Sequence, residues 1–239
     1  MGKQKSGAGY KRNDQMTYYM NLVKFIRSME DHLFRVRQAE KLHNVWKTSL
    51  LLALFSVLIY IWMAYLGIGT TPISPAAISA TEIEYEQYKY WFILGRAVYG
   101  LIFTALVLFI PSLIIYAFTG ISYPKLLIMQ QVVLAVLLAE RVIWIPLAAF
   151  IGLEWHVSPL SLGIIASYFT EIDWFIYFFG AISLFQLWVI WFQVKFISGF
   201  HAIGKRGLWL IVISLHILTW VLAATIAAVD THIISGWFE

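Results

Sequence analysis

One stretch of the sequence, residues 126–153, is long and apolar enough to cross a lipid bilayer and still carries two adjacent charges near its midpoint, Glu140 and Arg141. A charged side chain at the centre of a spanning helix costs about 2.5–3.5 kcal/mol on insertion scales. Because both charges need partners, other apolar segments must pack around this one. The stretch therefore predicts a bundle of membrane-spanning helices.

Four further apolar runs accompany it, and about 20 residues is the length that an α-helix needs to cross the hydrocarbon. Hydrophobic residues make up 61% of the 239 residues and charged residues only 13%. A soluble domain of this size has no need of so much apolar surface. We therefore expect an all-α polytopic membrane protein, a bundle of five transmembrane helices with spans at residues 48–66, 94–118, 126–151, 174–197 and 208–229.

The segment before the first span has two parts. Residues 1–15 are polar, basic and glycine-containing, which predicts a disordered tail. In residues 16–47 apolar side chains recur at helical steps of three and four, at Met20, Val23, Ile26, Met29, Leu33 and Val36. We expect an amphipathic cytoplasmic helix region resting on an anionic inner leaflet, with docking on a partner protein or a merely solvated helix as alternatives.

The connections between spans carry their own signals. Residues 81–92 mix acidic and aromatic side chains, which predicts a short interfacial piece before the second span, and Pro111 predicts a kink within that span. The apolar connection before residue 174 predicts a short helix at the membrane surface.

Basic residues set the expected orientation. Ten of the 17 Lys and Arg precede the first span, and Lys195, Lys205 and Arg206 flank the turn after the fourth. The positive-inside rule then places the N-terminus in the cytoplasm. An odd number of spans makes residues 230–239 an extracytoplasmic tail.

Counting residues from the span ends brings four polar side chains to a similar depth: Glu140, Arg141, Gln186 and His216. Buried ionisable groups of this kind mark proton, ion or ligand sites, as in a small transporter or channel. They also serve as polar links between helices. We favour the second interpretation of this candidate intramembrane cluster, because the sequence has no inverted repeat.

Basic residues near the cytoplasmic ends of the spans are candidates for lipid or partner docking. They are Arg35, Arg37, Lys41, Lys47, Lys205 and Arg206. A polybasic segment beside a membrane is attracted to anionic lipids.

The sequence gives little support to catalysis. Cysteine is absent, so thiol chemistry and disulfides are excluded. The six histidines lack the spacing of a zinc site, and no glycine-rich phosphate loop is present. We expect a protein that is not an enzyme, with no cofactor, no metal and no nucleic-acid partner.

The last two expected spans carry a resemblance. Ile172, Asp173, Trp174 and Phe175 open the fourth span, Ser183 and Leu184 lie within it, a basic glycine-bearing turn follows, and the final span is rich in alanine. Together with a basic amphipathic run before the first span, this order resembles the bacterial branch of the Ypt/Rab-interacting-protein (Yip-type) membrane family over residues 30–229.

The resemblance implies five spans, a cytoplasmic N-terminus, a place in the bacterial cell membrane and no known catalysis. Some bacterial relatives are linked to ABC exporters. The expectation that follows is an accessory or assembly partner of other membrane proteins, such as an ABC-type exporter.

Overall fold

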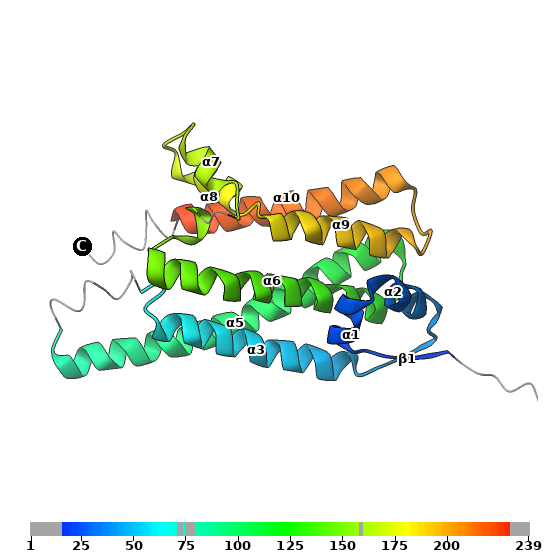
Figure 1. Ribbon diagram of the computed structural model, residues 1–239, viewed down its shortest axis with the longest axis horizontal. Helices are drawn as coiled ribbons and strands as arrows, with labels where there is room; N and C mark the ends of the chain where they lie inside the picture. Colours follow the sequence, from blue (N-terminus) through cyan, green and yellow to red (C-terminus); the bar gives the residue numbers. More distant parts are fainter. Residues whose placement is uncertain (1–15, 71–73, 75–79, 158–159, 230–239) are drawn as a thin grey trace, which may run out of the picture.

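The computed structural model describes residues 16–70, 74, 80–157 and 160–229, and this part of the chain is mostly helical. Long helices lie side by side along one axis (Figure 1). Four of them are long and apolar enough to cross a membrane, which fits the prediction of a mostly helical membrane protein, although five such helices were expected. These four are α3 (Val45–Tyr65), α5 (Glu82–Thr119), α6 (Tyr123–Ile151) and α10 (Lys205–Val229).

Helix α6 is the centre of the bundle. It packs against α3, α5 and the shorter helix α9 (Leu184–Ser198). Pro124 lies in its first turn, where a missing N–H costs nothing, and Gly152 ends it with a left-handed backbone at φ 72°. Residues 126–134 of α6 are all buried. The stretch that the sequence singles out therefore does pack among the others.

Helix α5 is longer than the expected second span. It begins at Glu82, where Thr81 and Glu84 form a reciprocal capping box. Helix-forming residues continue from there, so the expected interfacial piece at residues 81–92 is the first part of α5 rather than a separate element. This part, residues 82–93, is called the α5 arm below, and it extends past the end of α3 (Figure 1).

The fourth expected span, residues 174–197, is not one continuous helix. It is divided into α8 (Asp173–Gly180) and α9, with residues 181–183 between them. Ser183 starts α9 as its N-cap, because its Oγ accepts the N–H of Gln186 at 3.2 Å.

Residues 160–162 supply partners for the backbone groups that the break sets free. Leu162 N–H donates to the Ile182 carbonyl, and Leu184 N–H donates to the Leu160 carbonyl, both at 3.0 Å. A break inside an apolar segment is tolerated where such partners exist.

The connection between α6 and α8 folds back on this break. It contains the 3₁₀ turn η2 (Trp155–Val157) and the short helix α7 (Gly163–Ser167). Two glycines allow the close approach: a Cβ on Gly163 would collide with the carbonyl oxygen of His156, and one on Gly180 would lie 2.7 Å from the His156 Cβ.

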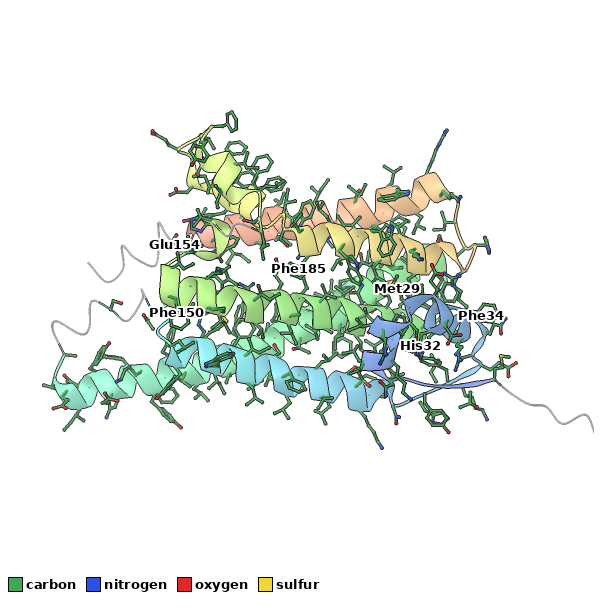
Figure 2. All side chains as sticks on the ribbon, viewed as in Figure 1. Met29, His32, Phe34, Phe150, Glu154 and Phe185 are labelled. Atoms are coloured by element: carbon green, nitrogen blue, oxygen red, sulfur yellow. The ribbon has the colours of Figure 1, made fainter. Side chains whose placement is uncertain are left out.

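A small N-terminal cap covers one end of the bundle. Strand β1 (Thr17–Tyr19) pairs in parallel with β2 (Lys41–His43) around α1 (Leu22–Arg27) and α2 (Met29–Gln38). The cap lies at the end where α3, α6 and α10 begin (Figure 1). Figure 2 labels Met29, His32 and Phe34 at this end, with Phe150 and Glu154 at the other.

The cap contains two short helices, and the expected apolar face is buried only in part. Leu33 and Val36 of that face are buried, but Val23 and Ile26 are 77% and 55% exposed, and Phe25, which lies off that face, is fully buried. The ring of Phe25 meets that of Phe192 in α9 edge-on, with centroids 6.3 Å apart. The buried side of the cap therefore packs on the bundle. The expected tails, residues 1–15 and 230–239, lie outside the described residues.

Candidate functional site

Glu140, one of the four predicted cluster residues, lies at the α8–α9 break. It is half-buried on α6 and forms a side-chain hydrogen bond with Ser183. Ser183 Oγ also accepts the backbone N–H of Gln186. The serine hydroxyl thus donates to the carboxylate while its oxygen caps α9. Ser183, which the predicted cluster did not include, therefore connects the Glu140 side chain with the backbone of Gln186.

His216 belongs to a different contact. Its Nε2 lies 3.0 Å from Oε1 of Gln193, and both side chains are buried between α10 and α9. Gln193 is seven residues beyond Gln186, about 10 Å along the helix at 1.5 Å per residue. His216 therefore forms its own pair with Gln193, away from Glu140.

The side chain of Arg141 makes a separate contact, with an aromatic ring. Its guanidinium carbon lies 5.7 Å from the centroid of the Trp144 ring, one turn further along α6. Stacking on an aromatic face is a favourable setting for a guanidinium. The four candidates therefore divide into the Glu140–Ser183–Gln186 group, the Gln193–His216 pair and Arg141 on Trp144.

Other polar side chains inside the bundle also join helices. Gln131 of α6 donates through Nε2 to the Val45 carbonyl at 2.6 Å and to Ser49 Oγ at 2.8 Å in α3. Ser56 of α3 donates to the Gly100 carbonyl in α5 at 2.9 Å. Gly100 has no side chain to hold these helices apart, since a Cβ there would lie 3.1 Å from the backbone of α3.

Arg37, predicted to dock lipid or a partner, is used inside the fold. Its Nη2 donates to the carbonyls of Lys195 and Phe196 in the last turn of α9, at 3.1 and 3.5 Å. A cation at a helix C-terminus is stabilised by the helix dipole. Burial lowers the pKa of Arg37. The guanidinium lies directly over Gly199, where a Cβ would displace it.

The other predicted docking residues are exposed at the same end of the bundle. Arg35 pairs with Asp31 on the surface of α2 at 2.9 Å. Lys41, Lys47, Lys205 and Arg206 are exposed, and no ion pair of theirs is found in the described part of the chain. These four remain available to an anionic partner.

Two surface cavities are present. One, of about 490 Å³, follows one face of the α5 arm between Glu82 and Trp91. The other, of about 460 Å³, lies between residues 42–47 and the start of α6. Among the described residues no three His, Asp or Glu side chains gather in a way that could hold a metal ion.

Comparison with protein-family models, with curated proteins and with solved structures finds no match for this chain.

Proposed function

We propose that the chain is a five-crossing integral membrane protein that acts, without catalysis of its own, as a docking and assembly partner of other membrane proteins. In this proposal α8 and α9 together make the fourth crossing. The N-terminal cap lies in the cytoplasm and the α5 arm outside the cell.

The observation that carries the proposal is the use of the polar groups inside the bundle. Gln131 with Ser49, Ser56 with Gly100, and His216 with Gln193 each join two helices. Hydrogen bonds of this kind act as links between membrane helices. These interior hydrogen bonds hold helices of the bundle together, and the outer surfaces are left for recognition.

The α5 arm is the surface that best fits a protein partner. A helix of 38 residues is about 57 Å long at 1.5 Å per residue, well beyond the ~30 Å of bilayer hydrocarbon. The arm exposes Ile83, Tyr90 and Trp91 beside Glu82 and Glu86. Exposed aromatic side chains with charged neighbours are typical of binding hot spots and their rims. An ABC-type exporter is the partner class that the Yip-type resemblance suggests.

Site-specific photocrosslinking in native membranes tests this proposal. A photoreactive residue replaces Trp91 in the arm, and the matched control replaces Leu113, which is exposed on the same helix within the hydrocarbon. The expected result is a defined adduct with one exporter subunit from position 91 and none from position 113. Purifying that subunit must in turn recover this chain. Identical adducts from both positions, or self-adducts alone, would contradict the proposal.

A second candidate function, a small proton or cation transporter, is favoured by the position of Glu140. A carboxylate facing a broken helix is the arrangement that many transporters use for coupling ions. The test is proton flux into proteoliposomes containing the native chain, Glu140→Gln or Arg141→Ala, with Glu154→Gln as the control at an exposed acid. Flux that is lost only in the Glu140 and Arg141 variants supports transport. Equal flux in all preparations would contradict a transport function that depends on Glu140.

A further inference from the structure

The cavity at the N-terminal end of the bundle, here called the α3–α6 pocket, has no part in the proposed function. Residues 42–47, which lead from β2 into α3, form one side, and Tyr123, Pro124 and Leu127 of α6 form the other. Its volume of about 460 Å³ is within the range of small-molecule sites. The lining residue Val45 is fixed to α6, because its carbonyl accepts a hydrogen bond from Gln131 Nε2.

The charge at this pocket is positive and unneutralised. Lys47 lines it and has no ion-pair partner in the described part of the chain, and His43 lies beside it. Two other basic residues of the same end are paired, since Arg35 contacts Asp31 and Lys195 contacts Glu30 at 2.7 Å, whereas Lys41, Lys205 and Arg206 do not line the pocket. An anion bound at the pocket would be the counter-charge that Lys47 lacks.

The two helices that begin at the pocket add to this preference. The N-cap residues of α3 and α6, Asn44 and Ser122, make no side-chain capping bond, and neither first turn contains an acidic residue. Helix α5, which begins at the other end, has a complete capping box with Glu84. Uncapped N–H groups at a helix start favour a negatively charged acceptor.

An apolar stripe leads away from the pocket along α3, and it indicates which kind of molecule the bound anion belongs to. Its side chains recur every four residues, so each lies next to the following one, and the stripe winds around the helix by about 40° per step. Each is large, apolar and exposed: Trp46, Leu50, Leu54, Leu58 and Trp62. Phe109 of α5 borders the start of the stripe, its ring centroid 6.2 Å from that of Trp46. An inorganic phosphate would not contact this stripe, whereas an acyl chain would pack along it.

We propose that the α3–α6 pocket binds the head group of an anionic phospholipid from the leaflet at the N-terminal end. Lys47 pairs with the phosphate, and Tyr123 lies within reach of the head group as a hydroxyl donor. The acyl chains lie along the stripe that begins at Trp46. The site is specific in position, unlike a diffuse attraction of basic residues to a charged leaflet.

Native mass spectrometry of the delipidated full chain, titrated with phosphatidylglycerol or phosphatidylcholine, tests the site. We expect a single phosphatidylglycerol to bind more tightly than phosphatidylcholine. Lys47→Gln should weaken it about five-fold, the effect of about 1 kcal/mol for one basic residue near a membrane surface, and Lys47→Arg should restore it. The matched controls Lys24→Gln and Arg27→Gln, which remove the same charge from exposed positions of α1 at this end, should leave it unchanged. The melting temperature of each lipid-free variant verifies that it is folded.

Two further outcomes would overturn the proposal. If all three Lys or Arg to Gln variants weaken phosphatidylglycerol equally, the attraction is diffuse and no pocket is involved. If inorganic phosphate displaces phosphatidylglycerol at equal concentration, or if Trp46→Ala leaves the lipid affinity unchanged, the acyl stripe has no role and the ligand is not a lipid.

Discussion

Gln193 and His216 form a buried polar contact between two apolar helices. Gln193→Leu should therefore leave the His216 ring unpaired and lower stability by about 1 kcal/mol, within the range of roughly 0.6–1.7 kcal/mol for hydrogen bonds between membrane helices. Unfolding in mixed detergent micelles measures this loss. The control is Gln186→Leu, since no hydrogen bond of the Gln186 amide is found in the described chain, and it should change little.

A double-mutant cycle separates the pair from the effect of each side chain alone. The cycle combines Gln193→Leu with His216→Leu, and the coupling should be close to the loss in the first variant because both residues act on one bond. A coupling near zero would mean that the 3.0 Å contact contributes nothing to the fold.

His32 makes the N-terminal cap sensitive to pH. Its Nδ1 lies 2.9 Å from the Tyr18 hydroxyl, and burial lowers the pKa of His32 below its ordinary value near 6.5. The folded chain keeps the ring neutral, while the unfolded chain takes up a proton near pH 6.5. The contribution of His32 to stability is therefore complete above pH 6.5 and is lost as the pH falls below it.

Hydrogen exchange of the cap at pH 7.5 and 5.5 checks this expectation. After correction for intrinsic exchange rates, residues of α1 and α2 should lose protection at the lower pH. His32→Gln should reduce that loss, and the exposed control His201→Gln should not. The same pH dependence in the native chain and in His32→Gln would assign the effect to other groups.

At the scale of elements, the crossing of η2, α7 and α8 depends on two glycines. Gly163→Ala should destabilise the fold by about 1–3 kcal/mol, because its Cβ would collide with a backbone oxygen of His156 that cannot move without its turn. The control is Gly95→Ala in α5, where a Cβ meets nothing within 4 Å, and it should be neutral or stabilising. Thermal unfolding in detergent compares the two variants. Equal melting temperatures would mean that the glycine approach is not a constraint.

The long helices could be predicted from the sequence, and the break between α8 and α9 could not. Apolar runs ended by glycine, as at Gly120 and Gly152, mark the C-terminal ends of α5 and α6 to within a few residues, although α5 begins well before the expected second span. Residues 181–183 are compatible with a continuous spanning helix. Their break depends on hydrogen bonds with residues 160–162, a contact between distant segments that no local pattern reveals.

The same limit explains what was missed in the candidate site. A fourth span taken as continuous has Gln186 near its middle, at a depth similar to that of Glu140, Arg141 and His216. Because the helix restarts at Leu184, Gln186 lies in the first turn of α9 and Gln193 is the residue that faces His216. Likewise, the helical period favoured Val23 and Ile26 as buried residues, whereas the cap turns Phe25 inward.

At the scale of the whole molecule, the number and direction of crossings can be tested on the native sequence, because the chain contains no cysteine. Single cysteines at exposed positions report which side of the membrane each lies on. Arg35 in the cap and Lys205 at the start of α10 lie at one end of the bundle, and Glu86 lies in the α5 arm at the other (Figure 1). An impermeant maleimide should label Glu86→Cys in intact cells, and Arg35→Cys and Lys205→Cys only after permeabilisation.

Each labelling result that differs from this expectation identifies the part of the topology that is wrong. The chain has crossed three times by the end of α6, so Lys205 returns to the side of Arg35 only if α8 and α9 cross together. If Lys205→Cys is labelled in intact cells together with Glu86→Cys, there is no fourth crossing, and α8 and α9 lie on one side of the bilayer. If Arg35→Cys and Lys205→Cys are labelled in intact cells and Glu86→Cys is protected, the chain crosses five times in the opposite orientation. The basic residues would then lie outside, against the charge asymmetry that orients most membrane proteins.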